Sequence, residues 1–205
     1  RGCAREPGVR PVPSDLSLPS DGEVVPADAF VNRVIELDRL IGDLSASQKI
    51  FLISPRRYGK SSLISHALAA MSKRGALTVE VTVSTYSSYV AFLEGYARAI
   101  VAAETKWDKA RHWIRETIRS ARAEVRYVPD ASALGALTVS FPSVRSDRDV
   151  SRLAQEVFAL PARLAEVRKR PVVVALDEFQ AIEGFNGGSV EHAMRAAVQH
   201  QRQVG

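Results

Sequence analysis

The chain has 205 residues, of which 46% are hydrophobic and 25% are charged, and its net charge is +5. This composition is ordinary for a soluble globular protein, and the length suffices for one domain with a substantial core. No apolar run approaches the roughly 20 residues that a membrane-spanning helix needs, so we expect no membrane segment. The single cysteine, Cys3, excludes an internal disulfide framework and fits a cytoplasmic, reducing compartment. The histidines share no metal-ligand spacing with it, so no zinc site is expected.

The first 28 residues contain five prolines and few large apolar side chains, which predicts a flexible tail before a folded domain at 29–205. Asn32 is expected to cap a helix, because the apolar residues that follow keep the helical period: Val34, Leu37, Leu40, Ile41 and Leu44. The next apolar run, Ile50–Ile53, predicts a strand over about residues 49–54.

That strand leads into a loop that predicts a nucleoside triphosphate site. In such a loop, successive backbone N–H groups and the start of the next helix converge on the phosphates. Lys60 would reach the β- and γ-phosphates, and the Ser61 hydroxyl would ligate Mg²⁺. The expected binding residues are Ser54, Pro55, Arg56, Arg57, Tyr58, Gly59, Lys60, Ser61 and Ser62.

The loop departs from the usual pattern at its first position, where Ser54 replaces glycine. Its context supports the phosphate-loop interpretation, because an apolar strand precedes it and helical apolar spacing follows it. The alternative is an ordinary turn between a strand and a helix. Arg56 and Arg57 would either favour bound phosphates or pair with carboxylates on the domain surface.

The helix after the loop should end near Lys73, and the alternating residues 77–83 predict a strand near a sheet edge. A core helix over Tyr89–Ile100 and a second helix over about Thr105–Arg122 follow. One face of the second helix carries a basic stripe, which would either bind a nucleic-acid backbone or remain a solvated surface. The stripe consists of Arg111, Arg115, Arg119 and Arg122.

A helical and irregular insertion is expected over about residues 105–150, in which 124–141 form irregular chain or a small hairpin. Another helix should kink or restart at Pro161, because proline lacks a backbone donor. The continuously apolar run Val172–Leu176 predicts a parallel strand covered on both faces. After a turn at 186–188, Ser189 is expected to cap a last helix that reaches about residue 202.

Two carboxylates follow the apolar strand directly. Asp177 would ligate magnesium, and Glu178 would polarise a water against the γ-phosphate, which makes Glu178 and Lys60 the expected catalytic residues. The alternative is that both are solvated charges at the end of a strand. No signature of a phosphoryl-acceptor site accompanies them, which disfavours a small-molecule kinase.

These motifs resemble a known group. The loop 54–63 and the later run Leu176–Gln180 are similar to the Pro-Arg-Arg phosphate loop and Asp-Glu-Phe-Gln motif of prokaryotic AAA+-type ATPases common in archaea. Phe30–Arg33 is similar to the Phe-x-x-Arg that opens that domain. The resemblance implies that Phe30, Val31 and Arg33 approach the adenine and that Gln180 belongs to the second motif.

The sequence thus predicts an α/β P-loop NTPase of the AAA+ type, with three layers and a parallel sheet. The resemblance implies the strand order 5-1-4-3-2, so the fourth strand should start just after Gly205, and we expect residues 1–205 to be an incomplete domain. An open sheet edge would make such a domain associate and hydrolyse weakly. The expected activity is magnesium-dependent ATP hydrolysis that drives a conformational change. The alternative is a nucleotide-loaded switch or DNA-associated scaffold with little turnover.

Overall fold

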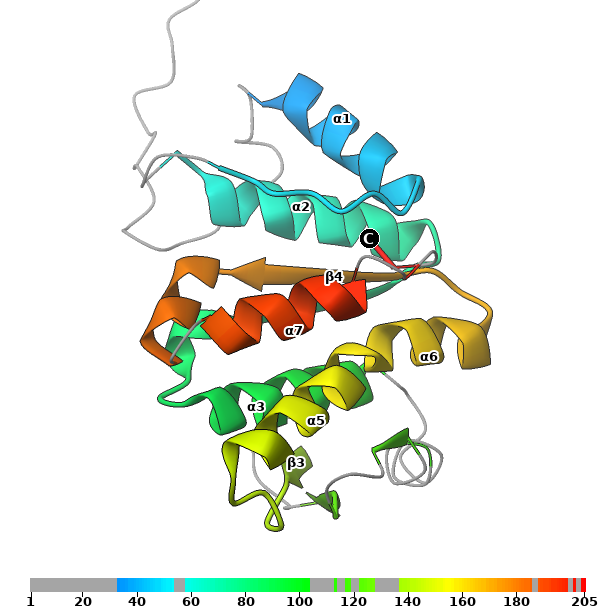
Figure 1. Cartoon of the computed structure of the whole chain (residues 1–205). Coiled ribbons are helices and arrows are strands. Elements are labelled where there is room, and N and C mark those ends of the chain that lie inside the picture. Colours follow the sequence, from blue (N-terminus) through cyan, green and yellow to red (C-terminus); the bar gives the residue numbers. More distant parts are fainter. Residues whose placement is uncertain are drawn as a thin grey trace, which may run out of the picture.

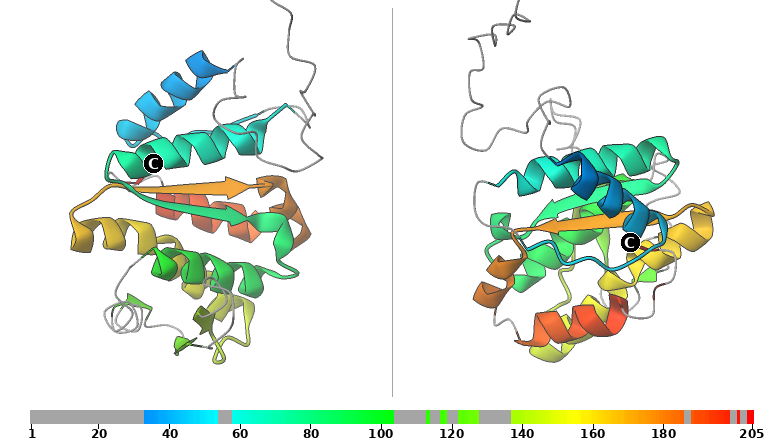
Figure 2. Two further views of the ribbon diagram at one scale, coloured as in Figure 1. Left: turned by 180° about the vertical axis from the view of Figure 1, so that it is seen from behind. Right: turned by 90° about the horizontal axis from the view of Figure 1, so that it is seen from above.

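The computed structural model describes residues 33–53, 58–103, 113, 117–118, 122–127, 137–185, 188–198, 201 and 204–205. Two parallel strands lie between two layers of helices, and the views from behind and from above show the same layering (Figures 1 and 2). The strands are β1 (Leu77–Thr82) and β4 (Val172–Asp177). One face is covered by α1 (Val34–Ser45) and α2 (Lys60–Lys73). The other is covered by α3 (Tyr89–Ala102), α5 (Asp147–Phe158), α6 (Leu160–Arg168) and α7 (Gly188–Val198). The predicted three-layer α/β fold of a P-loop NTPase is confirmed.

The two strands pair in parallel along their whole length, from Leu77 opposite Val172 to Thr82 opposite Asp177. The predicted alternation in β1 is confirmed, because Val79 and Val81 are buried in the core beneath α3. In a parallel pair both strands end at the same edge of the sheet. The residues that follow β1 and β4 are therefore neighbours.

The opposite edge of β4 is paired only where β4 begins, as far as the described residues extend. Val204 forms a parallel bridge with Val172, and Gly205 donates to the Val172 carbonyl and accepts from the Val174 N–H, both at 3.0 Å. The expected order places the fourth strand on this edge of β4.

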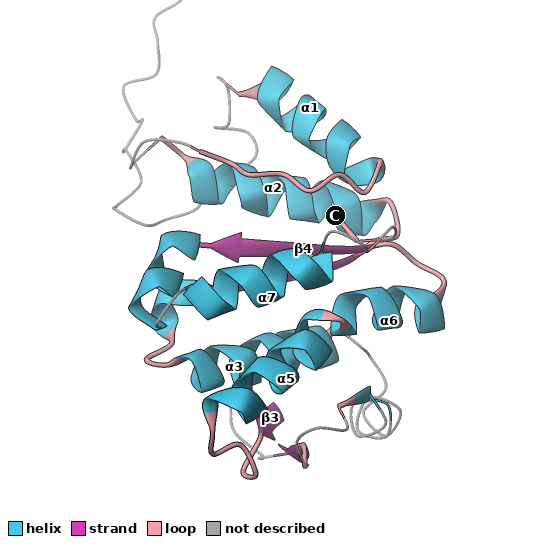
Figure 3. Cartoon of the chain, in the orientation of Figure 1, coloured by secondary structure: helices cyan, strands magenta, loops and turns pink. Residues whose placement is uncertain are grey.

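The strand predicted at 49–54 is the main correction. Residues 49–53 are loop, not strand, and no backbone hydrogen bond joins them to β4 (Figure 3). The physical reason is that a strand requires a hydrogen-bonded neighbour. The apolar pattern is present, but the structure places no partner strand against these residues.

The larger part of the core lies between the sheet and α3. Phe92 is fully buried there, and four aromatic rings surround it with centroids 5.9–6.3 Å away. These rings belong to Tyr86, Tyr96, Phe158 and Phe185. A smaller cluster joins α1 and α2 to β4 through Ile41, Met71 and Val173. The predicted interpretation of the α3 aromatics as core residues is confirmed.

Helix boundaries follow local chemistry. Ser88 accepts the Ala91 N–H to cap α3, and Ser146 and Asp149 form a capping box at the start of α5. The hydrogen bond from the Ser146 hydroxyl is the main reason that the pKa of Asp149 is lowered. α5 ends at Phe158 and α6 restarts with Pro161 in its first turn, as predicted. The last helix, α7, begins at Gly188, one residue before the predicted cap position at 189.

The described part of the predicted insertion packs against α3 through β3 (Leu137–Ser140). β2 (Glu124–Tyr127) and β3 pair antiparallel, which confirms the hairpin alternative. The Glu94 carboxylate on α3 accepts the Phe141 N–H at 2.9 Å and so joins the hairpin to the core. Trp113 and Thr117 are helical, and most of the predicted basic helix falls outside the described residues.

Candidate functional site

The start of α2 carries the last residues of the predicted phosphate loop. Gly59 has φ +67°, a left-handed conformation that glycine adopts without a steric penalty, and the helix begins at Lys60. The Gly59 carbonyl accepts the Leu63 N–H at 3.0 Å and so forms part of the first turn. Lys60 and Ser61 therefore lie where backbone N–H groups have no partner within the helix and the helix dipole is positive.

Asp177 at the end of β4 joins these two side chains. Lys60 Nζ lies 2.5 Å from Asp177 Oδ1, and Ser61 Oγ donates to Asp177 Oδ2 at 2.9 Å. The serine and the aspartate are 116 positions apart in the sequence. The fold thus brings together the three residues that the sequence assigned to phosphate and magnesium.

The electrostatics of Asp177 favour its charged form. The residue is 7% exposed, and burial by itself would raise the pKa of its carboxyl group. Hydrogen bonds from Lys60, from Ser61 and from the Glu178 N–H, together with the charge on Lys60, hold that pKa below its ordinary value. Asp177 is therefore an anion poised against a cation and a hydroxyl.

Glu178 takes a different direction from its neighbour. Its φ is +52°, and its carboxylate accepts a hydrogen bond from Ser84 Oγ. Ser84 lies in the 3₁₀ helix η1 (Val83–Thr85), directly after β1. The carboxylate that the sequence assigns to a water thus has a hydroxyl partner on the neighbouring strand's end. Ser84 was missed, although the parallel pairing of the two strands would have placed it beside Glu178.

A second carboxylate that sequence reasoning missed lies on β1. Glu80 precedes by two residues the position that pairs with Asp177. Burial, followed by the negative charge of Asp177, raises the pKa of Glu80. Its alternation with Thr78 and Thr82 was recognised in the sequence, but not its position beside the candidate site.

The remaining predicted residues fall into separate groups. Ser54, Pro55, Arg56 and Arg57 lie outside the described residues, as do Phe30, Val31, Arg111, Arg115 and Arg119. Tyr58 is 67% exposed, whereas Ser62 is buried inside the first turn of α2. Arg122 donates its backbone N–H to Ser143 Oγ at 3.0 Å. Gln180 is exposed in the 3₁₀ helix η2 (Phe179–Phe185).

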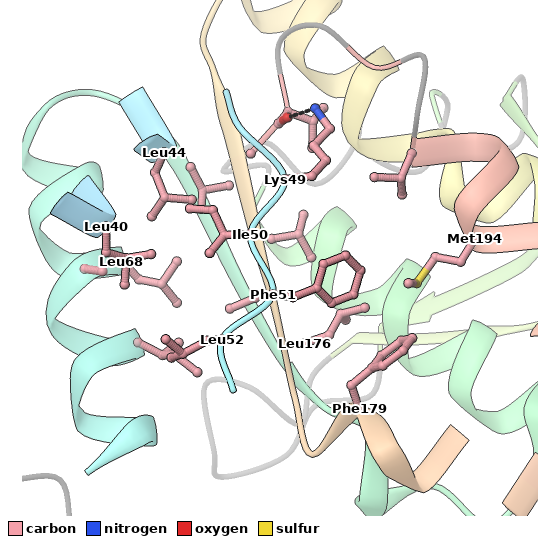
Figure 4. Close-up of a pocket in the computed structure, with 18 of the residues that line it drawn as sticks. Leu40, Leu44, Lys49, Ile50, Phe51, Leu52, Leu68, Leu176, Phe179 and Met194 are labelled. Carbon is pink, nitrogen blue, oxygen red and sulfur yellow. Dashed lines mark hydrogen bonds between the residues drawn. The ribbon is translucent and has the colours of Figure 1, made fainter. Parts of the chain in front are cut away.

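An apolar cavity of about 420 Å³ lies between residues 49–53 and β4 (Figure 4). Leu40, Leu44 and Leu68 line it on the side of α1 and α2, and Phe51, Phe179 and Met194 on the side of α7. At one end Lys49 Nζ donates to the Gln201 carbonyl at 2.6 Å and to the Val204 carbonyl, and burial lowers the pKa of Lys49. With so few polar groups, this cavity does not suit a triphosphate, and the candidate site is the polar cluster at the end of β4.

The residues at that cluster fit a magnesium ion. Mg²⁺ in nucleotide sites is held by one or two oxygen ligands from the protein together with phosphates and water. The Ser61 hydroxyl and the Asp177 carboxylate are already in contact, and both offer oxygen atoms as metal ligands.

No helix among the described residues is both long and apolar enough to cross a membrane.

Comparison with known proteins gives the family of the chain. A family model described as AAA domain matches residues 14–204, which is nearly the whole chain. No curated protein and no solved structure matches the chain. The family match and the parallel α/β fold agree on a nucleotide-binding, P-loop ATPase-like domain. The chain belongs to the AAA domain family.

Proposed function

We propose that the chain binds ATP with Mg²⁺ and hydrolyses it, and that the nucleotide state is coupled to a conformational change. The observation that carries this proposal is the contact of Asp177 with Lys60 and with Ser61, of which Ser61 is 116 positions away in the sequence. A solvated strand-end charge would not be buried to 7% exposure against a lysine and a serine at a helix start. The family match adds an independent argument.

Lys60 changes partners in this scheme. Its ammonium group pairs with Asp177 in the structure and would pair with the β- and γ-phosphates instead when ATP binds. Ser61 and Asp177 are the residues that would hold Mg²⁺. When bound, this ion would neutralise part of the charge on the phosphate oxygens. Because the pKa of Asp177 is lowered, the carboxylate stays charged for this role at neutral pH.

Glu178 is the candidate base. Its position one residue after Asp177 suits a carboxylate that takes a proton from the attacking water. In the structure the carboxylate accepts a hydrogen bond from the Ser84 hydroxyl, so it must exchange Ser84 for water before it can act. The same hydrogen bond favours a second candidate function, a nucleotide-loaded switch with slow turnover, in which Ser84 retains Glu178.

The test of binding uses Lys60→Ala. Loss of a charged contact to the phosphates should weaken ATP affinity by roughly 10- to 100-fold. Titration of a fluorescent ATP analogue with and without magnesium measures the effect, and circular dichroism checks folding. Lys73→Ala removes the same charge from the exposed end of α2 and is the matched control. Equal affinity for Lys60→Ala and the parent would refute the nucleotide site.

The test of chemistry uses Glu178→Gln. ATP should remain bound while turnover falls by roughly a hundredfold or more, because an amide cannot accept the proton. Glu183→Gln, an exposed carboxylate in η2, is the matched control. Ser84→Ala separates the two candidate functions, since it should raise turnover several-fold if Ser84 restrains the base. Turnover unchanged in Glu178→Gln would favour the switch.

A further inference from the structure

A hydrogen bond links the first helix to the end of the phosphate loop. Arg33 Nη1 donates to the Tyr58 carbonyl at 2.7 Å across 25 positions of sequence. The Nε of the same guanidinium donates to the Glu36 carboxylate one turn along α1. The Arg33 side chain is thus oriented by a residue of α1 and binds a single carbonyl of the loop.

That carbonyl belongs to the peptide group that joins Tyr58 to Gly59. A trans peptide is planar, so its C=O and N–H point in opposite directions. Holding the Tyr58 oxygen on the side of α1 therefore fixes the Gly59 N–H on the opposite side. Gly59 N–H is the last backbone donor before Lys60, and such donors bind phosphate oxygens in a phosphate loop.

Without a restraint this peptide group would have an alternative orientation. Gly59 is at φ +67°, and glycine adopts positive and negative φ with similar ease. Among the described residues, no heavy atom lies within 4 Å of the place where a Cβ would stand on Gly59, so the packing of those residues does not fix the orientation there. The Arg33 hydrogen bond supplies a restraint that the local sterics do not.

Arginine suits this task because its donors form a rigid planar fork. One edge contacts Glu36 while another nitrogen reaches Tyr58, so the carboxylate sets the direction of the bond to the loop. The Arg33 side chain is 23% exposed, which leaves it partly shielded from water. A lysine would carry the charge but has a single nitrogen, which could not satisfy both partners in this geometry.

We infer that Arg33, oriented by Glu36, is a positioning residue that sets the Gly59 N–H toward the phosphates of the nucleotide. This inference rests on the proposed ATP site and deepens it. It differs from the role that the sequence resemblance implies for Arg33, an approach to the adenine. The two roles predict different responses to a ligand that has phosphates but no base.

The experiment compares ATP with inorganic tripolyphosphate, which competes for the phosphate loop and has no adenine. Arg33→Gln should weaken both ligands by the same factor, about tenfold, because one charged hydrogen bond that orders the loop is lost. Arg33→Lys should restore only part of the affinity, and Glu36→Gln should weaken both ligands by a smaller factor. Arg39→Gln removes the same charge from an exposed position of α1 and should bind like the parent.

Four results would overturn the inference, three of them from variants of Arg33 and one from the parent. If Arg33→Gln weakens ATP but leaves tripolyphosphate unchanged, Arg33 acts on the base. If Arg33→Lys binds both ligands like the parent, the residue supplies charge and not orientation. If Arg33→Gln binds like the parent while Lys60→Ala does not, the phosphate site stands and the inference alone is wrong. A parent that binds neither ligand would remove the proposed function and this inference together.

Discussion

The two edges of β4 differ in how firmly they are held. Toward β1, every residue of β4 has a parallel partner, and Val79 and Val81 of β1 belong to the large aromatic core around Phe92. Toward residues 49–53, pairing is limited among the described residues to Val204 and Gly205, and an apolar cavity follows. Asp177 lies at the end of the strand that separates these two regions. On the firm, paired side, Ser84 follows β1 and donates to Glu178 beside this aspartate, and on the loose side residues 49–53 lead toward the phosphate loop.

The difference also separates two kinds of apolar residue. Val81 on the firm side is 3% exposed, whereas Phe51 and Ile53 on the loose side are 73% and 95% exposed. All three belong to patterns that predicted strands, an alternating one for Val81 and an apolar run for Phe51 and Ile53. Hydrophobic pattern alone therefore does not stabilise a strand, because its backbone must also be paired.

The largest expected contrast comes from placing a charge on each side. Val81→Asp should destabilise the fold by about 4 kcal/mol or more, because an unpaired carboxylate would be buried in the core. Phe51→Asp should change stability by less than about 0.5 kcal/mol, because the ring it removes is largely exposed. Urea unfolding followed by circular dichroism measures both. Equal losses would mean that the cavity side is packed as tightly as the β1 side.

A smaller contrast comes from adding one methyl group to a helix on each face of the sheet. A Cβ on Gly95 of α3 would stand 2.2 Å from the Tyr86 ring, so Gly95→Ala should cost about 1–3 kcal/mol by overpacking. Gly42 on α1 has no heavy atom within 4 Å of its Cβ position. Gly42→Ala should therefore stabilise by about 0.5–1 kcal/mol through helix propensity. Thermal melts of the two variants would show opposite shifts, and shifts of the same sign would contradict the contrast.

The smallest expected effect concerns Asp177 at the boundary. The pKa of its carboxyl group is below the ordinary 3.8 in the folded chain, so the unfolded chain binds the proton more tightly. The stability that the charged form contributes is present above the unfolded pKa of about 4 and is lost as the pH falls through the folded pKa. Asp177→Asn should thus be less stable than the parent at pH 6, and the difference should shrink at pH 3. Urea midpoints at both pH values test this, with Asp38→Asn on the exposed face of α1 as control. A difference that does not depend on pH would refute the assignment.

Much of the fold follows from pattern. Residues 77–83 alternate and 172–176 are continuously apolar, and these two segments form the parallel pair. Pro161 predicted the break between α5 and α6 because its effect is local. The predicted strand was wrong over 49–53, since pairing depends on a neighbour that no local pattern describes.

The candidate site was partly accessible in the same way. Lys60, Ser61 and Asp177 follow motifs with a chemical meaning, and the fold brings them together. Ser84 and Glu80 have no motif, because their relation to the site exists only once β1 lies beside β4. The contact from Arg33 to Tyr58 joins a side chain to a backbone oxygen, and every residue type has that oxygen, so the sequence does not indicate the contact.

The conformation of Gly59 has a consequence for chirality. No described residue crowds the position of a Cβ there, so glycine is favoured by the handedness of L-amino acids at this φ and not by contact with those residues. L-alanine at this position would be strained at φ +67°, at a cost of roughly 1–2 kcal/mol. D-alanine, whose preferred backbone angles are the mirror image, would fit without that strain and would have fewer conformations available when unfolded. A semisynthetic chain with D-alanine at this one position should therefore be at least as stable as the natural one.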